Sequence, residues 1–401
     1  MSFGQGLSGL NAASQNLDAI GNNIANAGTT GYKSSSVQFA DVYANSRIGL
    51  GVQVSRVSQR FSVGNVSSTN NQFDMAIAGE KGLFRLEQPN GAVVYSRNGE
   101  FFPNKEGMLV NAQGFYLTGY GAGTSTLERI RVPSGNIPPR ATTEMRLQLN
   151  LPAGATAIDA TAKPFDPADE TSYTQPFNYL VYDSLGNPHN ITQYYVKRES
   201  QNGDSVWDVH YAENGTEIPG SKATLTFDSA GRLKGQDVVA VTLPTPGGTN
   251  SPAAPLTFNV RYTGSTQFGG EFSRGNPYQD GYATGDYASM SISADGTIIA
   301  AYTNGETMEM GSLVLADFSN LQGLKPIGGN AWTESGESGQ PILGRPGENG
   351  LATIKGQAIE ESNVDMGQEL VNMIIAQRTY QANAQTIKTQ DQVLQTLVNL
   401  R

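Results

Sequence analysis

Both ends of the chain carry an apolar repeat of coiled-coil period, and the long stretch between them does not. Within residues 1–27, apolar and small side chains recur at intervals of three and four: Phe3, Gly6, Leu10, Ala13, Leu17, Ile20, Ile24 and Ala27. Residues 366–401 repeat this pattern, with breaks at Gln377 and Asp391, at Met366, Leu370, Met373, Tyr380, Ala384, Ile387, Leu394 and Val398. The spacing predicts one helix at each end. We expect the two helices to pair with each other, although each seam is sparse and an isolated pair of such helices would be marginal.

The first helix is almost free of charge. Asp18 is the only formal charge from Ser2 through Tyr32, and the face away from the seam is Asn, Ser, Gln and Gly. Burying uncharged polar groups that find partners costs far less than burying ions. We therefore expect this helix to be packed on more than one side, as in an assembly of copies. The alternative is that two amphipathic helices merely cover a domain core.

Each helix has a recognisable polar border. The segment 22–33, NNIANAGTTGYK, is rich in short polar side chains that hydrogen-bond their own backbone, so it should end the first helix. Ser362, Asn363 and Asp365 are candidate caps for the second helix. Glu360 and Glu361 are expected beside its start, where carboxylates interact favourably with the helix dipole.

The middle of the chain has the texture of β-structure. Turn pairs such as Asn90-Gly91 and Asp295-Gly296 separate short apolar runs. The predicted strands are near 83–86, 93–95, 108–110, 115–117, 177–182, 190–196, 205–211, 223–227 and 256–262. The simplest arrangement is nested, because both termini must reach one end of the molecule.

The predicted fold is therefore mainly β with terminal α-helices. The N- and C-terminal helices pair, an inner β-domain is discontinuous in sequence, and an outer β-domain is inserted into it. The expected divisions are a coiled-coil domain at 1–30 and 365–401, a linker region at 31–71 and 350–364, an inner β-domain at 72–146 and 281–349, and an outer β-domain at 147–280.

Composition excludes several classes of protein. The net charge is −10, and Lys and Arg form no cluster, so nucleic acid is not an expected partner. No apolar run approaches the ~20 residues that span a bilayer, so membrane insertion is not expected. The chain has no cysteine, which removes disulfides and thiolate chemistry. Because Lys33 is the first cation, a cleaved secretory leader is not expected.

No pattern of residues predicts an active site. His189 and His210 could form a metal pair, but a lone surface imidazole at each position is the preferred interpretation. The segment 183–188 resembles a calcium loop only faintly and is better explained as a hairpin turn. The glycines of 119–123 lack the Lys-Ser/Thr of a phosphate cradle. We expect no catalytic, cofactor-binding or metal-binding residues, no cofactor and no enzyme activity.

Three segments resemble signatures of the bacterial flagellar rod and hook (axial) proteins. They are NLDAIGNNIANAGTTGYK at 16–33, YSRNGEF at 95–101, and the stretch from 361 that begins ESNVDMGQELVNM. The length and the inserted block favour the hook members over the shorter rod members. The family positions matched here are Asn22, Asn23, Asn26, Gly31, Tyr32, Lys33, Asn363, Val364, Glu369, Gln377 and Arg378.

The resemblance implies a subunit of a curved, flexible extracellular tube that joins the motor's rod to the filament. It also implies that the terminal helices, near 3–27 and 366–400, pair as an antiparallel coiled coil that lines the inner tube. It implies a helical homopolymer whose subunits polymerise through a seam that includes Phe3, Leu10, Leu17, Ile20, Ile24, Leu370, Met373, Tyr380, Ile387 and Leu394. Further implied partners are the distal rod protein, the hook–filament junction protein, the hook cap or scaffold protein and the flagellar export apparatus. Secretion by the type III route, without a cleaved leader, is also implied. The alternatives are a distal rod protein and, from another class, a secreted β-rich adhesin or carbohydrate-binding module.

Overall fold

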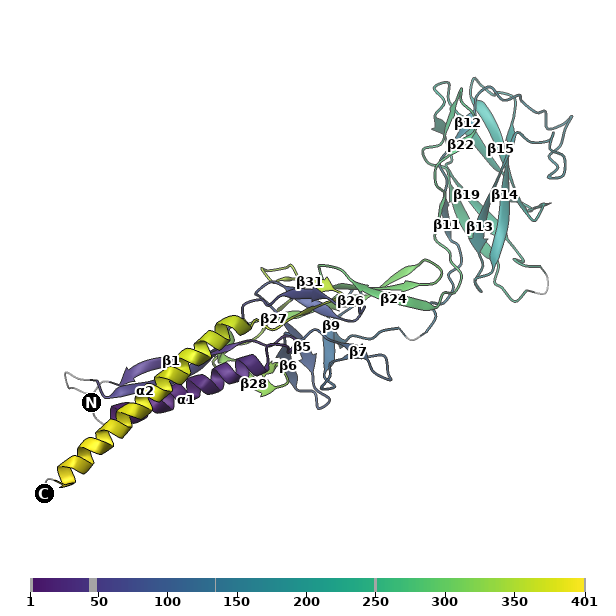
Figure 1. Ribbon diagram of the computed structural model, residues 1–401. Coiled ribbons are helices and arrows are strands. Elements are labelled where there is room, and N and C mark those ends of the chain that lie inside the picture. The colour runs from purple at the N-terminus through teal and green to yellow at the C-terminus, as the bar shows by residue number, and fades with distance from the viewer. Residues whose placement is uncertain (1–2, 43–48, 134, 249–250, 400–401) are drawn as a thin grey trace. The chain divides into compact units, whose positions relative to one another are not determined.

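The chain is mainly β with a helix at each end (Figure 1), which confirms the predicted fold class. The computed structural model describes residues 3–42, 49–133, 135–248 and 251–399. Helix α1 spans Phe3–Ala25, helix α2 spans Met366–Asn399, and a short 3-10 helix, η1, spans Leu321–Gly323. Within these residues, no helix is both long and apolar enough to cross a bilayer.

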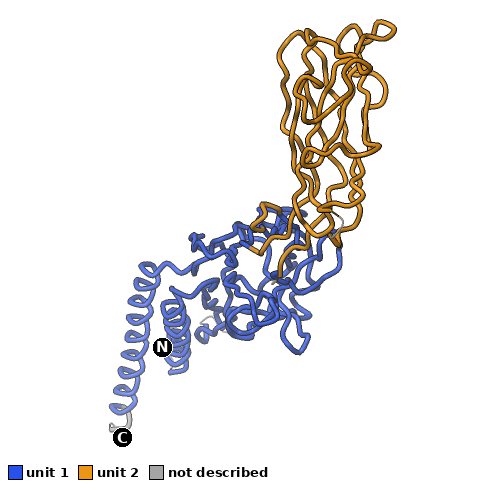
Figure 2. Tube along the Cα trace, turned by 90° about the vertical axis from the view of Figure 1, so that its right-hand side faces the viewer, with its two compact units in different colours: residues 1–134, 288–301, 307–401 blue, residues 135–287, 302–306 orange. Residues whose placement is uncertain are grey.

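The chain divides into two compact units, coloured in Figure 2. Unit 1 comprises Met1–Ser134, Ala288–Ala301 and Thr307–Arg401, and unit 2 comprises Gly135–Tyr287 and Tyr302–Glu306. The compact inserted unit is therefore wider than the outer domain expected at 147–280. The finer division of unit 1 into coiled coil, linker and inner β-domain stays a prediction.

Unit 1 combines the helices with strands drawn from both sides of the insertion. Its strands, two of which end one residue inside unit 2, are β1 Ser35–Val42, β2 Gly51–Gln59, β3 Val66–Ser68, β4 Met75–Ala78, β5 Leu83–Glu87, β6 Val93–Ser96, β7 Phe102–Pro103, β8 Leu109–Val110, β9 Tyr116–Gly121, β10 Leu127–Arg129, β24 Tyr287–Ile292, β25 Thr297–Tyr302, β26 Thr307–Leu313, β27 Leu315–Asp317, β28 Lys325–Gly328, β29 Ala331–Thr333, β30 Ile342–Gly344, β31 Thr353–Gly356 and β32 Ala358–Glu360. The order β26-β9-β5-β6-β29-β28 forms the body of its large sheet.

Strands from the two halves of the sequence pair directly in unit 1. The two-stranded pairs β3–β32 and β4–β31 are antiparallel and join residues 66–78 to residues 353–360. Strands β1 and β2 form a hairpin where the sequence indicated only a linker region. Part of the core beneath the sheet is aromatic: Tyr95 packs edge-on against Phe318 with ring centroids 4.8 Å apart.

Unit 2 is built from antiparallel and mixed sheets over one apolar core. Its strands are β11 Glu144–Arg146, β12 Leu149–Pro152, β13 Gln175–Tyr182, β14 Pro188–Lys197, β15 Ser205–Glu213, β16 Thr216–Glu217, β17 Ala223–Phe227, β18 Leu233–Lys234, β19 Val238–Leu243, β20 Leu256–Arg261, β21 Thr266–Phe268, β22 Ser273–Arg274 and β23 Tyr278–Gln279. The order β13-β14-β15-β17-β18 forms one sheet, and β19-β20-β11-β23 forms another.

A third, three-stranded sheet has the order β21-β12-β22. The first two sheets meet through large buried side chains. Strand β20 alternates buried and exposed residues along its length, which is the period expected for a strand with one face in a core. Tyr179 and Phe258 approach edge to face with centroids 6.4 Å apart, and the hydroxyls of Tyr211 and Tyr262 are 2.7 Å apart. Pairing the two hydroxyls satisfies polar atoms that burial would otherwise leave without partners.

Candidate assembly site

Helices α1 and α2 pack against each other in antiparallel directions. A Cβ added at Gly6 would lie 3.0 Å from Ile387 Cγ1, and one at Gly9 would lie 2.8 Å from Asn383 Oδ1. The partner's number falls as the number along α1 rises, so the two helices run in opposite directions. Glycine at these two positions removes the side chains that would hold the helix axes apart, and the predicted antiparallel pairing is confirmed.

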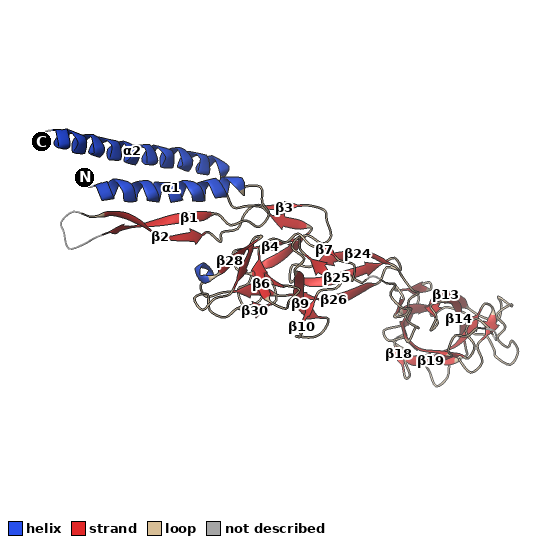
Figure 3. Cartoon of the chain, turned by 90° about the horizontal axis from the view of Figure 1, so that it is seen from below, coloured by secondary structure: helices blue, strands red, loops and turns tan. Residues whose placement is uncertain are grey.

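The other side of α1 packs on the β1–β2 hairpin, as Figure 3 shows. Gln5 Nε2 donates to the carbonyl of Gly49 at 2.6 Å, and the Val52 N–H donates to Ser8 Oγ at 3.3 Å. At the far end of α1, the buried Asn23 side chain pairs with both backbone groups of Ser35, at 2.8 and 2.9 Å. The expected packing of this nearly uncharged helix on more than one side is therefore present within a single chain.

Helix α2 contacts α1 through small and polar residues and leaves much of its apolar surface uncovered. Among the α2 residues whose side chains the structure describes, Ala376 is the buried one, and it lies on the same side as Asn383 and Ile387. The neighbouring face exposes 51% of Val371, 52% of Ile374 and 57% of Ile375. Exposed apolar side chains gathered along one element are typical of a surface that binds another protein.

The ten residues predicted for the seam do not share one environment. Ile20 is buried, and five are half-buried: Leu10, Leu17, Ile24, Met373 and Ile387. Four are exposed: Phe3, Leu370, Tyr380 and Leu394. The contact face of α2 includes Ala376 and Asn383, which the apolar pattern did not select. The assignment of the ten residues to polymerisation stays a prediction.

The segment after α1 is held by its own polar side chains. Asn26 Nδ2 donates to the carbonyl of Asn22 at 2.9 Å, and the Tyr32 hydroxyl donates to Asn22 Oδ1 at 2.9 Å and Asn23 Oδ1 at 3.2 Å. Burial raises the pKa of Tyr32, which keeps its hydroxyl a donor. Gly31 has φ +70°, and a Cβ there would lie 2.5 Å from the Asn98 nitrogen. Only glycine fits this position without strain.

Asn363 ties the start of the C-terminal segment to the segment after α1. Its Oδ1 accepts the Ser34 N–H at 2.7 Å, and its Nδ2 donates to the carbonyl of Arg60 at 2.7 Å. Two residues later Asp365 caps α2, because its Oδ1 accepts the Gln368 N–H at 3.1 Å. Among the other family positions near this helix, Val364 and Glu369 are half-buried, and Gln377 and Arg378 are exposed.

Glu360 does not lie beside the start of α2 near the helix dipole, as the sequence predicted, and Glu361 also has a different role. Glu360 ends β32, six residues before α2 begins, and its side chain is 0% exposed. Its Oε1 lies 2.5 Å from Lys33 Nζ, because a buried ammonium needs an opposite charge close by. Burial lowers the pKa of Lys33, and Glu360 opposes that shift. The exposed Glu361 accepts a hydrogen bond from Asn65 Nδ2 at 3.0 Å.

The expectation of surface imidazoles in unit 2 is also wrong. His189 and His210 are only 6% and 7% exposed. His189 Nδ1 lies 2.7 Å from Glu213 Oε1, and His210 Nδ1 lies 2.7 Å from Glu217 Oε1. Acidic residues on neighbouring strands thus let both rings be buried. Among the described residues, no group of His, Asp and Glu is arranged to hold a metal ion.

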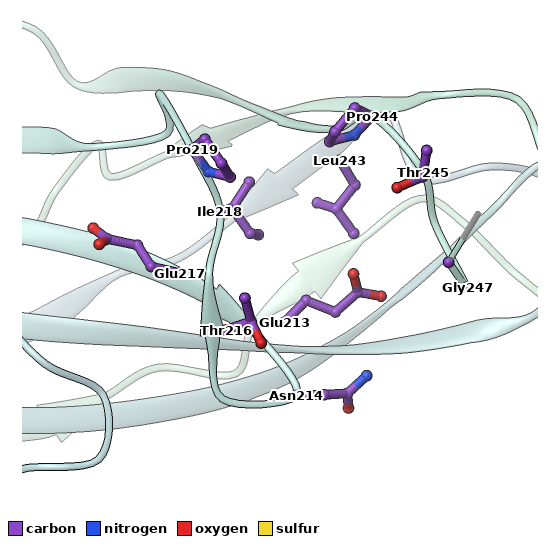
Figure 4. Close-up of a pocket in the computed structure, with 11 residues that line it drawn as sticks. Glu213, Asn214, Thr216, Glu217, Ile218, Pro219, Leu243, Pro244, Thr245 and Gly247 are labelled. Atoms are coloured by element: carbon purple, nitrogen blue, oxygen red, sulfur yellow. The ribbon is translucent and has the colours of Figure 1, made fainter.

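A hollow beside these pairs does not gather reactive groups. Glu213 and Glu217 line a cavity of about 490 Å³ together with Ile218, Leu243 and Pro244 (Figure 4). Both carboxylates already pair with imidazoles, and the remaining lining is mostly apolar or backbone. The nearby segment 183–188 is the predicted hairpin turn, in which Asp183 Oδ1 accepts the N–H groups of Leu185 and Asn187.

Four family models match successive parts of the chain. They are described as the flagella basal body rod protein at residues 5–33, the flagellar hook protein FlgE/F/G D1 domain at 76–161, the flagellar basal body protein FlaE D2 domain at 150–282, and the flagellar basal body rod FlgEFG protein C-terminal at 355–400. The last of these models contains Asn363, and the first ends one residue before Ser34, whose N–H binds Asn363.

Full-length relatives carry one description. The chain is 42% identical over 412 residues to the flagellar hook protein FlgE of Escherichia coli (strain K12), covering 100% of both chains. It is 31% identical to that of Brucella suis biovar 1, covering 99% of this chain and 98% of the relative. The crystal structure of Helicobacter pylori flagellar hook protein FlgE2 has a TM-score of 0.58 at 17% identity, covering 73% of this chain and 100% of that one, and supports the fold.

Proposed function

The chain belongs to the flagellar hook protein family, and on that premise we propose how its described residues build a hook. It is a structural subunit of the bacterial flagellar hook, located in the flagellum, and not an enzyme. Family membership also supports assembly with other flagellar components. The proposal concerns which surfaces bind sister subunits and what each part contributes to the tube.

The surface that carries the proposal is the uncovered apolar side of α2. Val371, Ile374 and Ile375 are each more than half exposed, although α1 lies against the same helix. A hollow of about 530 Å³ adjoins Ile375 and lies between α1, α2 and the β1–β2 hairpin, with Phe39 on its rim. Sister copies that seat apolar side chains here would bury both surfaces, which is the main favourable term in association. The terminal helices would then form the inner wall of a helical homopolymer.

The β-strands of units 1 and 2 would supply the outer, compliant part of the tube. The chain has 47 glycines and only 15% charged residues, so contacts between copies would be mostly hydrogen bonds that exchange with water. Each such contact is worth only about 0.5–1.5 kcal/mol and can break and re-form as the tube curves. This division would let the hook bend while it transmits torque from rod to filament.

The remaining partners follow from the family alone. The tube would join the distal rod protein at one end and the hook–filament junction protein at the other, growing beneath a hook cap or scaffold protein. The chain would reach this extracellular position unfolded, through the flagellar export apparatus and without a cleaved leader.

Electron microscopy of the purified protein under polymerising salt tests the proposal. We expect short curved tubes from the natural chain and monomers only from Ile374→Asn/Ile375→Asn, since two exposed contacts would become polar. The matched Ile374→Leu variant should still form tubes. Straight tubes would favour a rod protein. If the double Asn variant formed as many tubes as the natural chain, the exposed apolar side of α2 would not be the surface that binds sister subunits.

A further inference from the structure

Two segments that are far apart in sequence from each other and from Glu360 converge on its carboxylate. Lys33 lies at the end of the segment after α1, and Arg97 lies directly after β6 within YSRNGEF. Lys33 Nζ is 2.5 Å from Glu360 Oε1, and Arg97 Nε is 3.0 Å from Glu360 Oε2. Each cation therefore faces a different oxygen of one carboxylate. We call these three residues the Glu360 node.

Each member of the Glu360 node is also fixed by backbone groups. Arg97 donates through Nη1 to the Gly82 carbonyl at 2.7 Å and through Nη2 to the Gly79 carbonyl at 2.6 Å. Those two glycines flank the turn between β4 and β5, so Arg97 holds the node to the sheet. Lys33 Nζ donates in addition to the Ser62 carbonyl at 2.7 Å.

Glu360 also bonds to the segment that follows α1 and to the backbone at Gly64. Its Oε1 accepts the Gly64 N–H at 2.9 Å, and its backbone carbonyl accepts the Gly31 N–H at 2.8 Å. The backbone at Gly64 packs closely against the backbone of the residue after Glu360, because a Cβ at Gly64 would lie 2.0 Å from the Glu361 carbonyl oxygen. Gly31 belongs to the segment leaving α1, and Glu360 belongs to the segment leading to α2. One residue therefore binds both connections between the helices and the strands.

Burial of these charges fixes the geometry of the surrounding chain more than it adds to the stability of the fold. The three side chains are 0–1% exposed and comprise two cations and one carboxylate. A buried ion pair is often no more stabilising than an apolar replacement, whereas removing one partner leaves an uncompensated charge. Two cations held by fixed backbone carbonyls tolerate the carboxylate in only one position. The node thus sets the geometry of the chain around it.

We propose that Glu360 is a positioning residue that couples the terminal helices to the β-strands and carries force between them. The inference rests on the proposed function, since force arises only in the assembled tube. A pull on α1 reaches the node through Lys33, and a pull on α2 reaches it through residues 361–365. Arg97 passes both to the turn before β5. Without the node, the two connections would deform separately and the tube would be softer.

Three variants separate positioning from charge balance. Glu360→Asp keeps the charge but shortens the side chain by about 1.5 Å, so it cannot reach both cations. Lys33→Met/Glu360→Gln keeps the net charge of the node but removes the bridge. Glu361→Gln is the matched control, because it alters the adjacent exposed carboxylate. For each variant, amide exchange of the monomer and the persistence length of tubes in electron micrographs would be measured.

We expect both node variants to form tubes of shorter persistence length than the natural chain. Exchange at Gly31 and Gly64 should be about tenfold faster or more, with Met75–Ala78 and the Glu361→Gln control unchanged. Natural persistence length in both node variants would overturn the inference. Failure of Glu360→Asp to fold would also overturn it, because the geometry would then serve folding itself. Absence of tubes from the natural chain would instead refute the proposed function.

Discussion

The terminal helix pair and unit 2 treat their apolar side chains in opposite ways. In unit 2, Trp207, Phe258 and Tyr262 are each 0% exposed, and the core lies between strands of the same chain. On α2, Ile374 and Ile375 are more than half exposed, and the contact with α1 relies on Gly6 and Gly9. Unit 2 thus completes its core alone, whereas the helix pair leaves apolar side chains exposed. Under the proposed function this exposed surface binds sister copies, so assembly and independent folding would be carried by separate parts of the chain.

The largest expected effect is a core truncation confined to unit 2. Phe258→Ala should destabilise that unit by about 3–5 kcal/mol, because a fully buried ring is replaced by a cavity. The chain has two tryptophans, Trp207 in unit 2 and Trp332 in unit 1, so Trp→Phe variants allow each unit to be followed by fluorescence during urea unfolding. The Trp207 transition should move to lower urea while that of Trp332 stays in place. A common shift of both would show that the units do not fold independently.

A glycine substitution tests the opposite region. Gly9→Val should push α1 from α2 at Asn383 and cost about 1–3 kcal/mol through overpacking. Tube formation should be lost, while the Trp207 transition of unit 2 is unchanged. Gly21 lies in the same helix and has open space around it, so Gly21→Ala should instead stabilise α1 by up to about 1 kcal/mol. Tubes of natural yield from Gly9→Val would argue against close helix contact.

The smallest expected effect is a pH dependence restricted to unit 2, which holds both histidines. Burial lowers the pKa of His210 below its ordinary value of 6.5, and Glu217 only partly opposes the shift. The unfolded chain therefore takes up a proton at a higher pH than the folded unit. The neutral His210 therefore contributes to the free energy of unfolding of unit 2 above pH 6.5. This contribution should be lost as the pH falls below 6.5 and through the lower pKa of the folded unit.

Urea midpoints at pH 7 and pH 5 would measure this dependence. His210→Phe keeps the stacking on Phe165, whose ring centroid is 4.1 Å from the imidazole, and removes the titrating group. Its Trp207 midpoint should fall less between the two pH values than that of the natural chain. An equal fall would exclude His210 as the source, and a fall in the Trp332 midpoint would contradict the restriction to unit 2.

Local patterns made much of the fold predictable. The 3–4 repeats located both helices, and the strands expected near 83–86, 177–182 and 223–227 coincide with β5, β13 and β17. Turn glycines such as Gly91, with φ +88°, lie where the sequence indicated turns. These features depend on residues within a few positions of each other, so one sequence is enough to identify them.

The missed features depend on contacts between distant residues. Nothing near Lys33 or Arg97 indicates that both face Glu360, more than 260 positions away. The burial of His189 depends on Glu213 in the neighbouring strand. The apolar repeat selected the most hydrophobic side of α2, whereas Gly9 makes room for the polar Asn383. These contacts are made by small, polar and charged side chains, and a search for a hydrophobic repeat does not detect such residues.

The central claim is that sister subunits complete the terminal helix pair while unit 2 is complete in each monomer. Amide exchange on monomer and tube, read at Leu10–Ile24 and at strand β15, compares the two regions in one experiment. We predict weak protection of the helix in the monomer and strong protection in the tube, with β15 equally protected in both. Equal protection of Leu10–Ile24 in the two states would contradict the claim.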